Sequence, residues 1–436
     1  MRNNKPIQVF EYEFLAKDTN GFEHEHWLAL AKYNEVYGGN YFKLAHDGVR
    51  FQNYVGVIQV ENLTIEILPK IGKDASNESK SEWQQVLIEM LRECNWMKVH
   101  ANEKASLQFK YNSILEAYLE LFLKECELIL RQGLLKKYRF EESNCNSLKG
   151  KLLFGKNIQK NLVHQEHFYT RNQKYDRNNI YNQLLLKALK LIPIISNSPL
   201  LKDRVYSLQF AFPELDDIMV NEQTFSSLTF DRKNSHYQSA IEISAMLLLN
   251  YRPNISSGAN KILAILFDMN SLWEEYIYRQ IEKWNIYKWK IAPQDQSEFW
   301  RQTSTNRKKI IKPDIVISNG LKTTIIDTKW KLPEDDIPSD SDLKQMFVYN
   351  EYWEGMTSIL LYPHAIFRES PIFIKGIFND IPNLNNYSKT VNGNYETLEM
   401  HSCGIMKLSV TKAKILDENI GQRIINFLNE NIFNEQ

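Results

Sequence analysis

Short runs of alternating apolar and polar residues dominate the start of the chain, a pattern typical of β-strands. Residues 54–60 and 63–68 form two such runs, rich in Val and Ile, with two polar residues between them. This arrangement predicts a β-hairpin. Apolar residues at helical spacing over 83–91 then indicate a helix. We therefore predict a β-rich N-terminal domain over residues 1–105.

A helical pattern replaces the strand pattern in the middle of the chain. Apolar residues recur three and four positions apart over 114–130, 181–191 and 241–249. This spacing places them on one face of a helix, and the second stripe is expected to stop before Pro193. We predict a helical middle region over residues 106–254.

The last part of the chain alternates helices with strands, which favours an α/β fold. The predicted order is a helix, two strands joined by a turn at Asn319-Gly320, a helix, three further strands and a closing helix. These elements are expected over residues 259–284, 311–318, 323–329, 340–353, 358–362, 371–378, 404–410 and 417–431. The predicted fold is thus an α+β N-terminal region, with a β-rich part and a helical part, followed by an α/β domain over residues 255–436.

Composition narrows the class of protein. The 436 residues are 43% hydrophobic and 24% charged, which excludes intrinsic disorder, a collagen fibre and a coiled-coil rod. Lysine plus arginine and aspartate plus glutamate both number 53, so the formal net charge is zero. Because a protein that coats nucleic acid without specificity is usually basic, any DNA contact must come from a local patch.

Cysteine usage and the lack of long apolar segments indicate a cytoplasmic protein. The four cysteines lie far apart and form no Cys-x-x-Cys pair. This spacing argues against a disulfide framework and a thiolate zinc site, and it suits a reducing compartment. The apolar runs are far shorter than the roughly 20 residues that span a membrane, and the N-terminus lacks a signal peptide's apolar core. We expect a soluble protein with no membrane contact.

Two aspartates stand on the strands that flank the Asn319-Gly320 turn. Asp314 opens the first strand and Asp327 closes the second. Antiparallel pairing about the turn brings the two carboxylates together, where they repel each other unless a cation such as Mg²⁺ lies between them. Lys329 leaves the second strand on the same face, where its ammonium group can orient a water, assist its deprotonation or stabilise a phosphate. These residues predict phosphodiester hydrolysis, although charged residues at strand ends are usually only solvated.

Two neighbouring helices carry further candidates. Glu274 lies beside the apolar stripe of the preceding helix, so its carboxylate could point towards the metal or remain exposed. Gln345 and Tyr349 are four positions apart on the following helix and share a face, from which they could hydrogen-bond a phosphate or the site lysine. Asp340 and Ser341 are candidates for the N-cap of that helix.

A basic stretch precedes the first of the two strands. Arg301, Arg307, Lys308, Lys309 and Lys312 follow one another there with no acidic residue among them. Such a stretch either forms a solvated loop or contacts the phosphates of DNA.

One glycine-containing segment imitates a phosphate-binding loop. Residues 150–156 have glycines and a lysine at the required spacing, but Asn157 stands where such loops need a hydroxyl that ligates Mg²⁺. The bulky apolar residues between the glycines indicate a strand instead. We therefore expect the chain to bind no nucleotide.

The candidate residues resemble the motif of the PD-(D/E)XK nucleases. More narrowly, nearly the whole chain resembles the McrC family, the nuclease subunits of McrBC modified-cytosine restriction systems. The first likeness rests on Glu274, Pro313-Asp314, the run Asp327-Thr328-Lys329, Gln345 and Tyr349. The second rests on residues 54–58, 65–72, 148–152, 176–185 and 232–237. One departure is Thr328, where the family pattern has a small residue such as Ala.

The resemblance implies a function for the whole chain. It implies an N-terminal adaptor region and a PD-(D/E)XK restriction-endonuclease-like domain, in which Asp314, Asp327 and the backbone carbonyl of Thr328 bind Mg²⁺, with Mn²⁺ as a possible substitute. It also implies a DNA endonuclease that assembles with an McrB-like AAA+ GTPase ring, stimulates it, and relies on it to recognise modified cytosine. The alternatives are a stand-alone DNA repair nuclease of the same fold, and a non-catalytic assembly subunit that only stimulates the motor.

Overall fold

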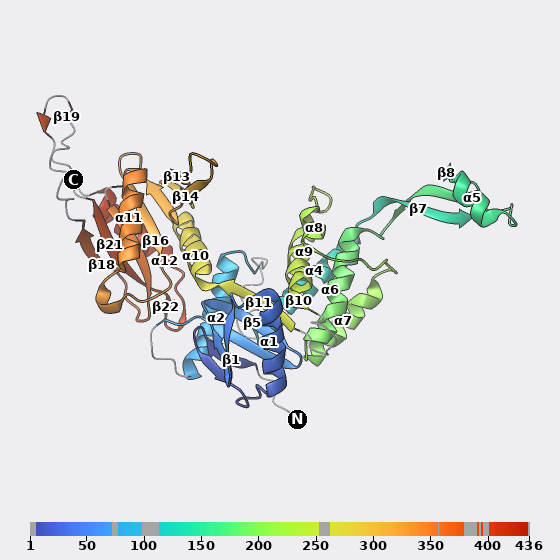
Figure 1. The fold of residues 1–436 in the computed structure, drawn as a ribbon, viewed down its shortest axis with the longest axis horizontal. Coiled ribbons are helices and arrows are strands. Elements are labelled where there is room, and N and C mark those ends of the chain that lie inside the picture. The colour runs from blue at the N-terminus through green and yellow to red at the C-terminus, as the bar shows by residue number, and fades with distance from the viewer. Residues whose placement is uncertain are drawn as a thin grey trace.

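The computed structural model describes residues 6–71, 77–97, 113–252, 262–355, 357–378, 390–391, 394–395 and 401–434. These residues form three bodies arranged as an open arch (Figure 1). The N-terminal sheet lies in the middle, the helices of residues 113–252 form one end, and the C-terminal sheet forms the other. A long β-hairpin projects from the helices, and we call it the arm.

The N-terminal sheet contains the predicted hairpin. Its strand order is β1 (Ile7–Phe10), β6 (Leu63–Leu68), β5 (Tyr54–Val60), β11 (Ile262–Asp268) and β10 (Tyr251–Arg252). The hairpin is confirmed, since β5 and β6 pair antiparallel as far as Val60 opposite Leu63, and Glu61 in the turn has a φ of 52°. One hydrophobic cluster joins this sheet to helix α1 (His24–Tyr37) and to a smaller sheet of β2 (Phe14–Ala16), β4 (Gly48–Phe51) and β3 (Phe42–Ala45).

The helix predicted over 259–284 is wrong over residues 262–268, while residues 259–261 lie outside the described residues. Residues 262–268 form β11, which pairs antiparallel with β5 from Ile262 opposite Val60 to Asp268 opposite Tyr54. A short, continuous apolar run fits a buried strand as well as a helix, so its pattern could not distinguish the two. The chain therefore passes back through the first sheet after residue 254, while the division into domains at 105 and 254 stays a prediction.

The middle body contains α4 (Ile114–Gln132), α6 (Ile180–Ile195), α7 (Pro199–Ala211), α8 (Glu222–Ser226), the 3-10 turn η2 (Ser235–Tyr237) and α9 (Gln238–Asn250). The helices predicted over 114–130, 181–191 and 241–249 are confirmed, but α6 continues through Pro193 instead of stopping before it. A proline leaves the carbonyl four residues earlier without its helical donor. Here that carbonyl, Leu189 O, accepts a hydrogen bond from Gln209 Nε2 of α7 at 2.9 Å. A tertiary contact thus replaces the missing bond.

The prediction of a helical middle region missed the arm. Its strands β7 (Lys137–Cys145) and β9 (Phe168–Asp176) pair antiparallel along their whole length, and β8 (Lys151–Leu152) and α5 (Phe154–Asn161) fill the connection. Residues of β7 alternate between half-buried and exposed, so neither face carries the buried apolar row that marks a half-buried strand. Segment 150–156, predicted as a strand, is a turn followed by β8 and the start of α5.

The C-terminal sheet has the order β12 (Lys290–Pro293), β15 (Ile315–Ser318), β16 (Thr323–Thr328), β17 (Thr357–His364), β21 (Ser402–Ser409) and β18 (Ile372–Ile377). The pairs β16–β17 and β17–β21 are parallel and the others antiparallel. One face packs on α10 (Met269–Lys283) and α12 (Ile420–Leu428), which a π-helical turn (Asn429–Phe433) continues, and the other packs on α11 (Asp340–Trp353). Because both faces are covered, the central strands are apolar on both sides.

The strand predicted over 311–318 is in fact two strands. β14 (Lys308–Ile311) forms a separate hairpin with β13 (Ser297–Arg301), and β15 begins only at Ile315. Pro313 lies between them and has no N–H to donate to a sheet, which explains the interruption. The strands predicted over 323–329, 358–362, 371–378 and 404–410 and the helix over 340–353 are confirmed, whereas the closing helix begins at Ile420.

Short elements complete the fold. They are η3 (Glu334–Asp336), β19 (Thr390–Val391), β20 (Asn394–Tyr395), β22 (Thr411–Lys412) and β23 (Ile415–Leu416). The longer helix α2 (Asn77–Glu93) confirms the helix predicted over 83–91. None of the helices in the described part of the chain is long and apolar enough to cross a membrane.

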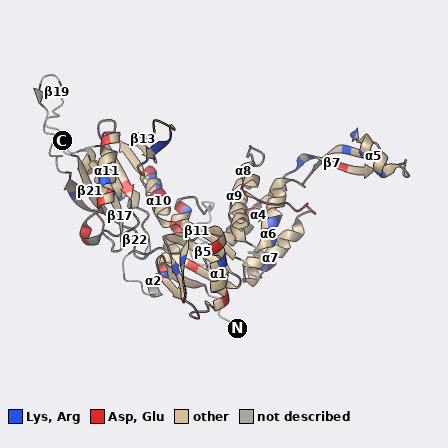
Figure 2. Cartoon of the chain, viewed as in Figure 1, with Lys and Arg blue, Asp and Glu red and all other residues tan. Residues whose placement is uncertain are grey.

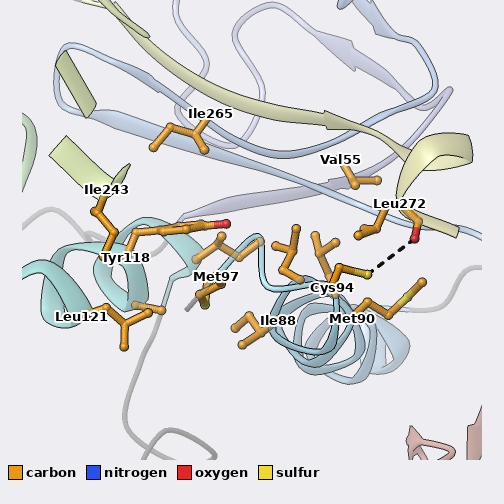
Figure 3. Close-up of a cluster of buried hydrophobic side chains, with 14 of the residues drawn as sticks. Val55, Ile88, Met90, Cys94, Met97, Tyr118, Leu121, Ile243, Ile265 and Leu272 are labelled. Carbon is orange, nitrogen blue, oxygen red and sulfur yellow. Dashed lines mark hydrogen bonds between the residues drawn. The ribbon is translucent and has the colours of Figure 1, made fainter. Parts of the chain in front are cut away.

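A shared hydrophobic core holds the N-terminal sheet against α10. Val55 of β5, Met90 of α2, Cys94 just beyond it and Leu272 of α10 lie together in this core (Figure 3). Cys94 Sγ lies 3.8 Å from the carbonyl oxygen of Leu272. The N-terminal and C-terminal bodies are therefore packed on each other through buried side chains.

Candidate active site

The hairpin of β15 and β16 brings Asp314 and Asp327 together, as the sequence predicts. Ile315 pairs with Ile326, so the two aspartates occupy the next positions at the same end of the hairpin. Asp314 Oδ2 accepts hydrogen bonds from the backbone nitrogen of Thr328 at 2.7 Å and from its Oγ1 at 2.8 Å. These two bonds fix the Asp314 carboxylate against the end of β16.

Both aspartates resist ionisation. Asp327 is only 1% exposed, and burial, followed by the charge of Asp314, raises its pKa to about 7. Burial also raises the pKa of Asp314, although the two hydrogen bonds from Thr328 oppose the shift. Two carboxylates that destabilise each other's charge favour a bound cation.

Lys329 provides a positive charge beside these acids. Its Nζ lies 2.6 Å from Asp327 Oδ2, 3.7 Å from Asp342 Oδ1 and 3.4 Å from Gln345 Oε1. Burial alone would lower the pKa of Lys329, but the surrounding carboxylates, Asp327 first, outweigh burial and raise it. The lysine therefore remains protonated at neutral pH, which suits electrostatic stabilisation better than proton abstraction.

Helix α11 supplies Gln345 and Tyr349, which contact each other as predicted. Gln345 Nε2 donates to Tyr349 Oη at 2.7 Å, and Tyr349 Oη donates to the carbonyl oxygen of Lys312 at 2.9 Å. The pair therefore connects Lys329 to the segment that carries Asp314. The N-cap of α11 is Ser339, whose Oγ accepts from the backbone nitrogen of Asp342 at 3.2 Å, so the assignment to Asp340 or Ser341 is wrong by one or two residues.

Glu274 reaches the same site from α10. Its Oε1 accepts from Gln294 Nε2 at 2.6 Å, and Gln294 Oε1 accepts from Lys312 Nζ at 3.0 Å. The backbone nitrogen of Gln294 also donates to the carbonyl oxygen of Asp314 at 2.8 Å. Burial, and then the charge of Asp314, raises the pKa of Glu274. The carboxylate of Glu274 is thus close enough to act electrostatically on Asp314.

Sequence reasoning missed Gln294 and the role of Asp342. Gln294 follows β12 in the left-handed conformation, with a φ of 47°. Asp342 contacts Lys329 and also Lys331, whose Nζ lies 2.6 Å from its Oδ2. Neither residue belongs to a spacing pattern with the aspartates. Only the position of Asp342 three residues after a capping serine offers a signal, and that signal indicates a helix start rather than a site.

The basic stretch lies mainly on the β13–β14 hairpin, where the ribbon of Figure 2 is coloured blue for Lys and Arg residues. Glu298, just upstream of the stretch, pairs with Arg301 at 2.5 Å and with Lys308 at 2.7 Å. Within the described residues, Arg307 and Lys309 form no ion pair. A role of the hairpin in DNA binding stays a prediction.

The donor atoms of the site suit a hard cation. The described residues contain no group of three or more His, Cys, Asp or Glu side chains arranged to hold a metal ion. Asp327 Oδ2 is nevertheless buried and accepts no directed hydrogen bond within those residues, despite its ion pair with Lys329. Asp314, Asp327 and the carbonyl of Thr328 together offer the oxygen ligands that Mg²⁺ prefers, and Mg²⁺ commonly keeps several waters.

The fold and this cluster define an α/β protein with an acidic, lysine-containing site at one end of a mixed sheet. The sequence identifies the family, because the model of the "McrBC 5-methylcytosine restriction system component" family matches residues 49–363. The chain belongs to this family. No curated protein matches the chain.

Two solved structures resemble the fold. One is a refined half-complex from a tetradecameric assembly of Thermococcus gammatolerans McrB AAA+ hexamers with bound McrC, with a TM-score of 0.67, 18% identity, and coverage of 97% of this chain and 100% of that chain. The other is the cryo-EM structure of the Thermococcus gammatolerans McrBC complex, with a TM-score of 0.49, 21% identity, and coverage of 64% and 87%. At these identities the first likeness indicates a common fold and no more.

Proposed function

We propose that this chain is the DNA-cleaving subunit of a modification-dependent restriction complex. Its family is that of a 5-methylcytosine restriction system, and the matched region, residues 49–363, includes Asp314, Asp327 and Lys329. The convergence of these three side chains at one end of β15 and β16 is the observation that carries the proposal. The order of these residues resembles the PD-(D/E)XK motif, with Asp314 after Pro313 and Lys329 two residues past Asp327.

Each residue of the cluster has a separate task. Asp314, Asp327 and the Thr328 carbonyl would hold Mg²⁺, with Mn²⁺ as a substitute. When bound, the metal would polarise the scissile phosphate and lower the pKa of a bound water. The protonated Lys329 stabilises negative charge on the phosphate, and Gln345 and Tyr349 orient this lysine. Glu274 and Gln294 steady Asp314 from the side of α10.

The partner we propose is an McrB-like AAA+ GTPase ring that recognises modified DNA. The support is the Thermococcus gammatolerans structure of similar fold, in which McrC is bound to McrB hexamers. The arm offers a contact surface, since Tyr138 and Phe140 on β7 are 68% and 63% exposed. Large apolar side chains that gather in solvent commonly mark a binding surface. Lys156, in the segment that resembles a phosphate-binding loop, pairs with Glu142 of the arm at 2.5 Å. We expect no nucleotide to bind there.

The test is cleavage of cytosine-methylated plasmid DNA by the chain, its AAA+ partner, GTP and Mg²⁺. Asp314→Asn should reduce the cleavage rate at least ~10³-fold, because it removes a charge that would hold Mg²⁺. Lys329→Met should reduce it by ~10²–10³-fold, because it removes a positive charge that acts on the reacting phosphate. The matched control is Asp340→Asn, at a carboxylate that is 92% exposed on the same domain. Cleavage by Asp314→Asn at the rate of the control would refute the site, and cleavage without the partner would favour a stand-alone nuclease.

A further inference from the structure

A buried hydrogen bond connects the N-terminal sheet to the candidate active site. Trp330, the residue after Lys329, donates its Nε1 hydrogen to Glu11 Oε1 at 2.6 Å. Glu11 follows β1, and the two residues are 319 positions apart in the sequence. Both side chains are almost completely enclosed, with 2% of Glu11 and 6% of Trp330 exposed.

The Glu11 carboxylate is itself fixed to the N-terminal sheet. Its Oε1 also accepts from the backbone nitrogen of Lys70 at 2.8 Å, just beyond the end of β6. Its backbone nitrogen donates to the carbonyl oxygen of Leu68 at 2.9 Å. Glu11 is therefore anchored to the edge of the N-terminal sheet, and its hydrogen bond to Trp330 joins the N-terminal body to the C-terminal body.

Trp330 contacts the other side of the active site as well. Its ring meets that of Trp273 edge to face, with centroids 5.2 Å apart. Trp273 is fully buried on α10 and directly precedes Glu274. The two rings in contact thus belong to the sequence neighbours of two candidate site residues, since Trp330 follows Lys329 and Trp273 precedes Glu274.

Burying the carboxylate of Glu11 beside Trp330 costs the protein stability. Burial raises the pKa of Glu11 to about 7. Among the described residues, its buried Oε2 has no hydrogen-bond partner. A buried carboxylate with an unpaired oxygen lowers stability compared with an apolar side chain of similar size. Stability alone therefore explains a carboxylate at this position poorly, and its orientation of Trp330 is the better explanation of its presence.

We propose that Glu11 is a positioning residue for DNA cleavage: through Trp330 it fixes the end of β16 and so the location of Lys329. This inference rests on the proposed nuclease function. The backbone nitrogen of Lys329 bonds to the carbonyl oxygen of Leu361 at 2.9 Å, which holds the strand on the side of β17. The Glu11 bond is a second attachment, and it makes the geometry of the site depend on the N-terminal sheet.

The experiment compares variants that break this bond with one that keeps it. Glu11→Leu removes the acceptor, Trp330→Phe removes the donor but keeps an aromatic ring, and Glu11→Gln retains an acceptor oxygen. In Glu11→Leu and Trp330→Phe, the kcat of DNA cleavage by the assembled complex should fall about 10- to 100-fold, because small displacements of a reacting group cost that much. The KM for DNA should stay within about twofold of the wild-type value. Glu11→Gln should restore most of the rate, and the double variant should lose no more than either single variant.

Glu66→Leu is the matched control, since Glu66 is an equally buried carboxylate of the same sheet that bonds to Gln84 and to the backbone of Ile114. It should lower thermal stability without a selective loss of kcat. Hydrogen exchange gives a measure independent of activity: Glu11→Leu should speed exchange in the peptide over 326–331, and Glu66→Leu should not. Unchanged exchange there, or full cleavage by Glu11→Leu, overturns the inference. If the wild type does not cleave at all, the proposed nuclease function fails, and the exchange result alone still decides whether Glu11 positions β16.

Discussion

Glu66 is a carboxylate that the protein encloses completely. It is 0% exposed and accepts from Gln8 Nε2 at 3.0 Å, from Gln84 Nε2 at 2.7 Å and from the backbone nitrogen of Ile114 at 2.5 Å. Burial raises its pKa from 4.5 to about 7 despite these bonds. The folded protein therefore binds this proton more tightly than the unfolded chain does.

This shift predicts how stability depends on pH. The contribution of Glu66 to the free energy of unfolding is fully present below pH 4.5 and is lost as pH rises through about 7. Glu66→Gln, which carries no charge, should abolish this loss and make the protein more stable than wild type at pH 8, by about 3 kcal/mol at most. Chemical denaturation at pH 5 and pH 8 measures both effects. If the stability of wild type and of Glu66→Gln depends equally on pH, Glu66 is not the cause of the loss. Some pH dependence should remain in the variant, because the pKa of Glu11 is also raised to about 7.

Site residues were predictable from sequence where one hairpin determines their positions. Asp314, Asp327 and Lys329 lie at or just beyond the ends of two strands joined by a short turn, so the pairing register alone brings them together. Gln294 and Asp342 come from a distant loop and a helix start, and only tertiary packing places them at the site. No local sequence pattern predicts such tertiary contacts.

Strands and helices were predicted best where one face is apolar. Helix α2 follows its hydrophobic periodicity and matches the structure. The β5–β6 hairpin also matches, because a two-residue turn separates its Val- and Ile-rich runs. β11 is apolar on both sides and reads equally well as a helix. The arm strands lack an apolar face, because β7 and β9 pair with each other outside the core. Periodicity thus fails at a strand that is apolar on both sides and at a pair of strands that has no buried face.

The position of β11 changes where the chain can be divided. A fragment that ends near residue 254 lacks the strand that pairs with β5 along its length. Such a fragment would expose the apolar edge of the N-terminal sheet and is not expected to fold well. The functions of the two ends are therefore better separated by point substitutions in the full chain.

The arm is the element whose exposed aromatic residues we propose to contact the partner ring. The double substitution Tyr138→Ser with Phe140→Ser should raise the concentration needed for half-maximal stimulation of the partner's GTPase by about tenfold or more, since buried aromatic contacts dominate interfaces. The matched control is Phe210→Ser on α7, where the side chain is 94% exposed but lies outside the arm. Identical stimulation curves for the double variant and the control would remove the arm from the interface.

The arch as a whole places the proposed binding surface and the candidate active site at opposite ends. The arm projects from the helices at one end, and the acidic cluster lies in the C-terminal sheet at the other (Figure 1). The N-terminal sheet stands between them and is tied to the C-terminal body by the shared core and by the bond between Glu11 and Trp330. Under our proposal, one chain binds a motor and cuts DNA with different surfaces.

The most direct test of this division of labour is one reaction that follows GTP turnover by the AAA+ partner and DNA cleavage together, with wild type and Asp327→Ala. The variant loses a carboxylate proposed to hold Mg²⁺ but keeps the arm and the N-terminal sheet intact. We predict that cleavage falls below detection while GTP turnover is stimulated as by wild type. Continued cleavage by the variant would contradict the site, and loss of stimulation by a folded variant that still binds the ring would contradict the separation of the two functions.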